Sequence, residues 1–240
     1  MWSNFATRID DALIGPVNSL IGRFATFDGF MEVLGHGDVA SGAFVMSIFW
    51  WYWFRQSDPP TTQRTREHLL CTMIAATAAL FVARALALTL PFRLRPRFDP
   101  ALQLNWPAAP DSLMFVDWSA FPSDHAVMFT ALTVGLCFVS LRMGLALLLF
   151  SLLVVSLPRV YYGVHYPTDI FAGLGLGALF GYCANASAVS RRLTARILLW
   201  ERRSPQGFYA VLFVVTLEFA TMFDAARSAA RAAFHLLTRH

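Results

Sequence analysis

Between two apolar runs of the sequence lies Pro158-Arg159-Val160-Tyr161-Tyr162-Gly163-Val164-His165-Tyr166-Pro167-Thr168-Asp169, so its polar groups are expected at a membrane surface. Pro167 suits the first position of a helix, which places Asp169 in the first turn. From there the carboxylate can reach back to His165, orient the ring and favour one tautomer. Arg159 adds a permanent forked cation. This combination is suited to attack on phosphate, although Arg, His and Asp are also ordinary interfacial residues at the end of a membrane helix.

A second polar cluster, Phe121-Pro122-Ser123-Asp124-His125, also precedes an apolar run. Ser123 is a natural N-cap, and the free amides of the first helical turn form an anion site that the helix dipole reinforces. The side chain of His125 would lie next to that site and act as a proton donor. Two histidines, each at a helix start and each beside an anion-binding group, favour a functional interpretation of both clusters.

Three signatures in order resemble those of the type-2 phosphatidate phosphatase superfamily, which includes membrane lipid phosphatases and the soluble vanadium haloperoxidases. They are Arg95-Pro96, then Pro122-Ser123-Asp124-His125, then Arg159 to Asp169. The second matches Pro-Ser-x-His and the third matches Arg-x5-His-x3-Asp. The signatures and the helices expected to carry them cover about residues 69–189.

The first signature departs from the family pattern. The family has a Lys seven residues before the Arg of Arg-Pro, and Leu88 occupies that place in a chain without any Lys. The candidates for supplying the missing charge are Arg93, Arg97 and Arg84. Pro158 is a second departure, since many members have Ser before the Arg of the third signature.

Composition indicates a membrane protein. The chain of 240 residues is 57% hydrophobic and only 14% charged, with a mean hydropathy of +0.52. The charges fall between apolar runs, which predicts an all-α polytopic membrane bundle. The net charge of +4 is carried by Arg alone and has no basic run interleaved with aromatics, so nucleic acid is not expected as a partner. Three cysteines inside apolar runs predict neither disulfides nor a metal site.

About six transmembrane helices are expected, with amphipathic segments at both termini. Residues 1–37 are predicted to be an interfacial segment or a cap over the bundle, 38–223 the transmembrane bundle, and 224–240 an amphipathic basic tail. The tail is an Arg-flanked helix with or without a preference for anionic lipid. Small-residue spacing among the glycines of the fifth span favours close helix packing. The predicted spans are 39–54, 69–92, 126–141, 143–158, 170–189 and 208–223.

The distribution of arginines predicts the orientation. Loops 55–67, 142 and 190–206 hold nine arginines, and the opposite side also holds nine. Setting aside Arg93, Arg95, Arg97 and Arg159 as site candidates leaves nine against five, so the first set of loops is expected in the cytoplasm. The three signatures then face the periplasm or exterior of a bacterial inner membrane.

Two further charges lie inside predicted spans. Arg84 is interpreted either as a support for the phosphate site or as the partner of Glu218. Glu218 itself is more typical of a packing or pairing residue than of a catalyst.

The resemblance implies phosphoryl transfer through a phosphohistidine, without metal or cofactor. By motif position, His165 is the nucleophile, Asp169 holds its ring, and His125 protonates the leaving group and then activates water. The phosphoryl group would be bound by residues of all three signatures. These are Arg93, Arg95, Ser123, Asp124, Arg159 and Gly163.

The signatures are most similar to those of the undecaprenyl pyrophosphate phosphatases associated with bacitracin resistance. The expected substrate is therefore a lipid phosphate or diphosphate, with undecaprenyl pyrophosphate first. Phosphatidate, phosphatidylglycerol phosphate and lipid A phosphates remain alternatives. Asp124 either supports its helix start or tunes diphosphate handling. A non-catalytic membrane scaffold or lipid transporter is the competing hypothesis, and Leu88 at the Lys position is its main support.

Overall fold

A computed structural model describes residues 4–35, 37–107 and 118–224. Every regular element in this part of the chain is helical, as expected from the composition. The predicted tail, 225–240, lies outside the described residues. The elements are α1 (Asn4–Asn18), α2 (Ala25–Gly35), α3 (Asp38–Phe54), α4 (Pro59–Thr89), η1 (Pro96–Phe98), α5 (Asp124–Cys137), α6 (Leu141–Phe150), η3 (Ser151–Ser156), α7 (Leu157–Tyr161), α8 (Pro167–Ala186), α9 (Ala188–Arg203) and α10 (Pro205–Ala220).

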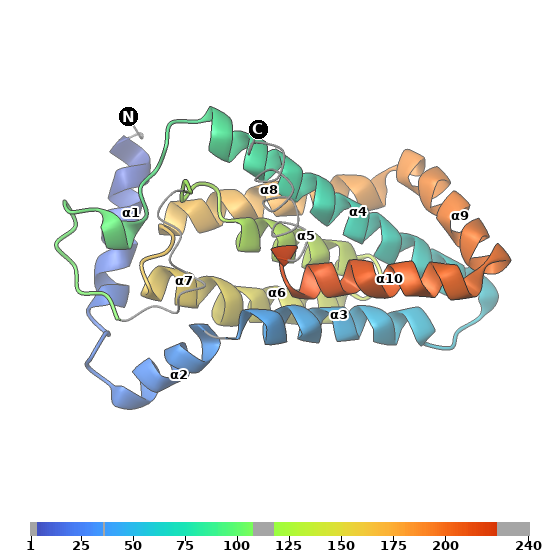
Figure 1. The fold of residues 1–240 in the computed structure, drawn as a ribbon, viewed down its shortest axis with the longest axis horizontal. Helices are drawn as coiled ribbons and strands as arrows, with labels where there is room; N and C mark the ends of the chain where they lie inside the picture. The colour runs from blue at the N-terminus through green and yellow to red at the C-terminus, as the bar shows by residue number, and fades with distance from the viewer. Residues whose placement is uncertain (1–3, 36, 108–117, 225–240) are drawn as a thin grey trace, which may run out of the picture. The chain divides into compact units, whose positions relative to one another are not determined.

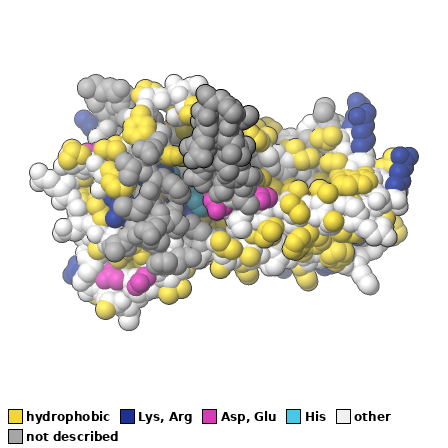
Figure 2. All heavy atoms as spheres, viewed as in Figure 1, with side chains coloured by type: hydrophobic (Ala, Val, Ile, Leu, Met, Phe, Trp, Pro, Cys, Tyr) yellow, Lys and Arg dark blue, Asp and Glu magenta, His cyan; other side chains and the backbone are white. Residues whose placement is uncertain are grey.

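The chain divides into two compact units. One consists of residues 37–67 and 192–240, and in it α3 lies beside α10 (Figure 1). The two helices approach closely at Gly42, where a Cβ would lie only 2.4 Å from the carbonyl oxygen of Ala220. Trp50 Nε1 donates to Thr216 Oγ1 at 3.1 Å. Apolar side chains cover much of the visible face of α3 and α10 (Figure 2), as expected for helices surrounded by lipid.

The other unit, residues 1–36 and 68–191, contains all three signatures and is called the site unit below. Its centre is α5, which is buried along most of its length and packs along α8 (Figure 1). The contact face of α8 is Gly173, Gly177 and Gly181, where a Cβ would meet the backbone of α5 at 2.8 Å or less. The predicted small-residue packing is confirmed at these three positions, whereas Gly175 faces open space.

Each of the six predicted spans coincides with helix, but their lengths differ. Two segments are long and apolar enough to cross a membrane, namely Pro59–Thr89 and Leu141–Tyr161, and α2 with α3 would add a third if they form one bent span. That all six cross remains a prediction. The third span was expected to reach residue 141, but α5 ends at Cys137 because Ser140 caps the next helix, accepting from Met143 N at 3.4 Å.

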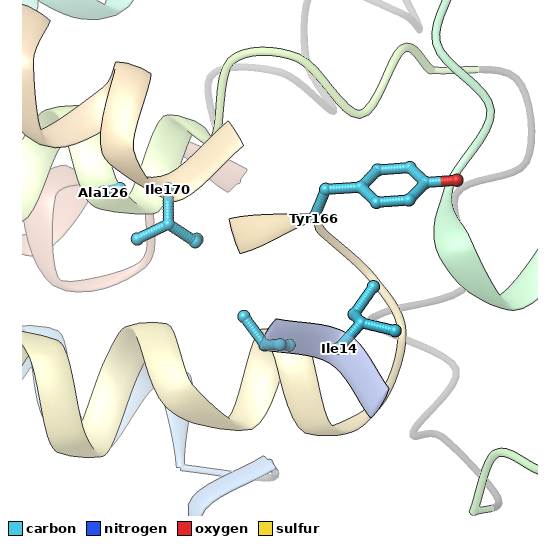
Figure 3. Close-up of a cluster of buried hydrophobic side chains, with 5 residues drawn as sticks. Ile14, Ala126, Tyr166 and Ile170 are labelled. Carbon is cyan, nitrogen blue, oxygen red and sulfur yellow. The ribbon is translucent and has the colours of Figure 1, made fainter. Parts of the chain in front are cut away.

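Helix α1 packs against the site unit through one face. Asp10, Ile14 and Val17 recur at helical spacing, and Ile14 lies in a buried cluster with Tyr166 and Ile170 (Figure 3). The packing shows what this face contacts. The predicted interfacial position of residues 1–37 stays a prediction.

The helix that leads into the third signature is irregular. A π-helical segment, η3, separates α6 from α7 and ends two residues before Pro158. Proline has no N–H to donate and its ring crowds the carbonyl four residues earlier, so a regular α-helix cannot continue through it. Arg159 follows at once, and its guanidinium donates to the Val155 carbonyl.

The tight helix contact generates a stability prediction. Gly177→Ala should lower the free energy of unfolding by about 1–3 kcal/mol, because the new Cβ would lie 2.3 Å from the Val127 carbonyl oxygen. The matched change Gly175→Ala, in open space on the same helix, should be neutral or stabilising. Thermal unfolding in detergent measures both. Equal melting temperatures for the two variants would contradict this packing.

Candidate active site

Backbone hydrogen bonds bring the three signatures together. Ala120 N donates to Arg93 O at 2.9 Å, and Ser123 N donates to Asp169 O at 3.2 Å. Arg97 N donates to Gly163 O at 2.9 Å. Segments distant in the sequence therefore meet at the start of α5 and the start of α8. The polar residues of all three signatures surround this junction.

The ring of His165 is fixed by a main-chain carbonyl. His165 is buried, and its Nδ1 lies 2.8 Å from Ala120 O and 3.7 Å from Asp169 Oδ2. Because a carbonyl oxygen only accepts, Nδ1 must carry the proton in the neutral ring. The lone pair then resides on Nε2. The expected interaction with Asp169 is thus the longer of the two, and the tautomer is set first by Ala120.

The carboxylate of Asp169 is fully buried and accepts from two directions. Tyr166 N donates to Oδ2 at 2.8 Å, and the Arg93 guanidinium pairs with Oδ1. Tyr166 is the N-cap of α8 and Pro167 its first residue, as predicted. The contact with Tyr166 N is therefore a reciprocal cap, which positions Asp169 as part of the helix start.

Arg93 lies between two carboxylates. Besides Asp169 it pairs with Asp10 of α1, and its NH1 donates to Thr168 Oγ1 at 2.9 Å. Arg93 was expected among the phosphate-binding residues, and these contacts instead connect it to the residues behind His165. Its role in phosphate binding stays a prediction.

A buried serine hydroxyl lies at the start of α5. Ser123 is the N-cap, as predicted, but its side chain makes no capping bond. Its Oγ is buried and, within the described part of the chain, has no hydrogen-bond partner. A buried hydroxyl without a partner is costly, and this one lies beside the free amides of a helix start, where an anion can bind. The predicted contact of Ser123 with phosphate stays a prediction. His125 lies in the first turn of the same helix and is half-buried.

Two arginines flank the nucleophile candidate, and both are buried. Arg95 NH1 donates to Val164 O at 3.1 Å, next to His165, and Arg159 accepts the amides of Val164 and His165 at its own carbonyl. Burial, together with the nearby charge of Arg84, lowers the pKa of Arg95 to about 10. At neutral pH it remains a cation, close to the start of α5 and to His165.

Gly163 and Arg97 shape the turn that carries His165. Gly163 has φ +65°, which favours glycine, and a Cβ there would meet the ring of Trp106 at 2.8 Å. Arg97 NH1 donates to Tyr162 O at 3.1 Å, and its NH2 donates to Pro107 O at 3.3 Å. Arg97 thus holds the loop in place. Gly163 contributes its conformation, and its expected phosphate contact stays a prediction.

Arg84 pairs with Asp124, the first residue of α5. Its guanidinium also lies 5.1 Å from the ring of Trp118, and its Nε is buried and, within the described residues, unpaired. This contact with Asp124 is consistent with the hypothesis that Arg84 supports the phosphate site. Glu218 belongs to the other unit.

Sequence reasoning missed three groups at this junction: the Ala120 carbonyl, Asp10 and Thr168. A main-chain acceptor has no side-chain signal. Asp10 is remote in sequence, but its helical spacing with Ile14 and Val17 was a detectable sign that α1 buries this face. Within the described ranges, no group of three or more His, Cys, Asp and Glu side chains is arranged to hold a metal ion.

Comparison with known proteins identifies the family. Residues 68–193 match the PAP2 superfamily, and the chain belongs to it. The phosphatases of this family support a hydrolase, and the apolar helices of the structure are consistent with a membrane protein.

Two relatives of similar sequence are named for polyprenyl substrates. Undecaprenyl-diphosphatase BcrC of Bacillus subtilis is 24% identical over 166 residues, covering 69% of this chain and 77% of that protein. The decaprenylphosphoryl-5-phosphoribose phosphatase of Mycobacterium tuberculosis is 35% identical over 122 residues, or 50% of this chain and 60% of that protein. Among solved structures, a transmembrane PAP2 type phosphatidylglycerolphosphate phosphatase from Bacillus subtilis aligns with TM-score 0.46 and 17% identity, covering 76% and 85% of the two chains.

The environment of His165 generates a pH prediction. Burial, reinforced by the charges of Arg95 and Arg159, lowers the pKa of His165 below its ordinary range, and the nearby Asp169 opposes this only in part. The ring should therefore stay neutral until the pH falls below about 6.5. In phosphatase assays, kcat/KM should show no His165-dependent loss above that pH. Arg95→Gln should move the acid limb to higher pH, because a positive neighbour is lost; a move to lower pH would contradict the assignment.

Proposed function

We propose that the protein is an integral membrane lipid phosphatase that hydrolyses undecaprenyl pyrophosphate to undecaprenyl phosphate through a phosphohistidine. The observation that carries the proposal is the 2.8 Å contact between His165 Nδ1 and the Ala120 carbonyl oxygen, from which a proton on Nδ1 follows. This leaves the Nε2 lone pair available beside two buried arginines. Membership in the PAP2 superfamily and the polyprenyl substrates in the relatives' names support the same reaction.

In the first step, Nε2 of His165 attacks phosphorus and the bond to the leaving oxygen breaks. His125 gives its proton to that oxygen, so no further negative charge builds up on it as the lipid phosphate leaves. Arg95, Arg159, the Ser123 hydroxyl and the first amides of α5 stabilise the charge on the phosphoryl oxygens. Asp169 stabilises the cationic ring that results.

In the second step, His125 takes a proton from water, and the water oxygen attacks phosphorus. The bond to His165 Nε2 breaks, inorganic phosphate leaves and the neutral ring is restored. Because arginines and helix amides supply the positive charge, the proposed reaction needs no metal ion. The Ala120 carbonyl keeps Nδ1 protonated, so the same nitrogen reacts in each cycle.

The Arg84–Asp124 pair supports a diphosphate rather than a monophosphate. It lies at the first residue of α5, adjacent to Ser123, and the charge of Arg84 reaches Arg95. The row of cations therefore extends beyond the arginines that influence His165. A second phosphate would exchange with the Asp124 carboxylate on Arg84 and use the unpaired Nε–H. Phe81 and Leu88 lie on the same stripe of α4 as Arg84, and both are exposed. This exposure suits a lipid substrate that approaches from the bilayer.

The proposed location is the bacterial inner membrane, with the site facing the periplasm or exterior. The arginine-rich loops predicted to be cytoplasmic are 55–67, 142 and 190–206. The signatures occupy the opposite ends of their helices. In this orientation the site would take lipid substrates whose phosphate headgroup lies at the outer surface.

A substrate panel in EDTA tests the proposal. Wild type in detergent should release phosphate from undecaprenyl pyrophosphate faster than from phosphatidate or phosphatidylglycerol phosphate, and His165→Ala should release none. Equal release by wild type and His165→Ala would exclude the phosphohistidine reaction, and loss of activity in EDTA that metal restores would exclude metal independence. A preference for phosphatidate or phosphatidylglycerol phosphate would assign that lipid instead.

An arginine variant separates the two phosphates. Arg84→Met should lower kcat/KM for farnesyl diphosphate roughly 10- to 100-fold, the value of one charge-assisted contact, and change that for farnesyl monophosphate by less than about threefold. Arg142→Met, at an exposed arginine, is the matched control. Equal losses on both substrates would make Arg84 a general support of the site.

A further inference from the structure

Among the acidic side chains whose burial the structure describes, only that of Asp169 is more deeply buried than that of Asp10 of α1, which lies outside the residues that match the family. It is 2% exposed and belongs to helix Asn4–Asn18, whereas the family match begins at residue 68. An isolated buried carboxylate is strongly unfavourable, so its contacts account for its presence. All of these contacts lead towards the start of α8.

Asp10 is fully engaged by three donors. Thr168 N donates to Oδ1 at 2.9 Å, Thr168 Oγ1 donates to Oδ2 at 2.8 Å, and Arg93 pairs with Oδ2. Thr168 immediately precedes Asp169. The amide of Thr168 is one of the free N–H groups of the first turn of α8, so Asp10 also complements the positive end of that helix.

Arg93 transmits the contact to the reacting histidine. Its NH2 pairs with Asp10, its NH1 pairs with Asp169, and Asp169 Oδ2 lies 3.7 Å from His165 Nδ1. The sequence of groups is carboxylate, guanidinium, carboxylate and imidazole. The guanidinium is planar and forked, so fixing one side of it with Asp10 fixes the direction in which the other side holds Asp169.

We infer that Asp10 is a positioning residue for the proposed phosphoryl transfer, holding Arg93 so that Asp169 and His165 keep their reactive geometry. This inference rests on the proposed function. It makes α1 part of the active site although it does not touch the reacting atoms. Ile14 and Val17 hold the same face of α1 against Val160, Tyr166 and Ile170, and Figure 3 shows Ile14 beside this cluster.

Charge balance gives the inference a second consequence. With Asp10 present, the charge of Arg93 is shared between two carboxylates. Without it, Arg93 neutralises Asp169 alone, and less negative charge remains to support a cationic ring at His165. Arg95 and Arg159 are the other charges near that ring, and both are positive. Loss of the Asp10 charge should therefore disfavour the protonated ring and the charged phosphohistidine alike.

The test compares Asp10→Asn with Asp11→Asn, its exposed neighbour on the same helix. Asp10→Asn should lower kcat on the order of 10- to 100-fold, as expected for misplaced reacting groups, with KM within about threefold of wild type. The acid limb of kcat/KM should move to lower pH. Asp11→Asn should match wild type in all three.

Two further variants separate positioning from stability. Ile14→Ala weakens the packing of α1 without changing any charge, so it should lower the melting temperature while kcat per folded enzyme stays within about threefold of wild type. Thr168→Val removes one donor to Asp10 and should give a smaller loss of kcat than Asp10→Asn. It replaces Asp10→Asn in the test if Asp10→Asn does not fold.

The outcomes are distinct. The inference would be overturned if Asp10→Asn lowered the melting temperature but left kcat and the acid limb unchanged, because its role would then be purely structural. If Asp10→Asn does not fold, the same result for Thr168→Val would overturn it. Wild type without phosphatase activity would instead overturn the proposed function.

Discussion

The hydrogen bond from His165 Nδ1 to the Ala120 carbonyl, 2.8 Å long, is the constraint on which the rest of the site depends. It selects the tautomer in which Nε2 is nucleophilic, and it can form only when the loop before α5 reaches the turn before α8. The contacts Ala120 N to Arg93 O and Ser123 N to Asp169 O hold that loop on both sides. The packing of Gly177 against the Val127 backbone keeps the two helix starts at this separation. Helix packing, loop position and the reactive nitrogen are thus consequences of one arrangement.

The distribution of charge around this bond separates two kinds of arginine. Arg95 and Arg159 are buried near the His165 ring, whereas Arg93 is balanced by Asp10 and Asp169. Two ion pairs already engage Arg93, so it has less charge to offer a phosphate. Leu88 stands where the family has a Lys, so that position supplies no charge to the site. Leu88 is 86% exposed and its side chain points away from the site unit's interior.

Much of the helical organisation could be predicted, because apolar runs and helix-start residues are local signals. Pro167 at the first position of α8 and Ser123 as N-cap of α5 follow directly from such signals. The end of α5 at Cys137 was missed, since a three-residue connection inside apolar sequence gives no break in hydropathy. Asp10, Thr168 and the Ala120 carbonyl were missed because their roles arise only when distant segments meet. Asp10 lies 83 residues from Arg93, a separation that no local pattern spans.

The most direct test of the account is to trap the covalent intermediate. A diphosphate lipid labelled with ³²P at its terminal phosphate is mixed with wild type, quenched in base during turnover, and the labelled peptide is sequenced by mass spectrometry. The account predicts a base-stable, acid-labile phosphoryl group on Nε2 of His165. Rapid turnover with no label on the protein, or label on His125 instead, would contradict it.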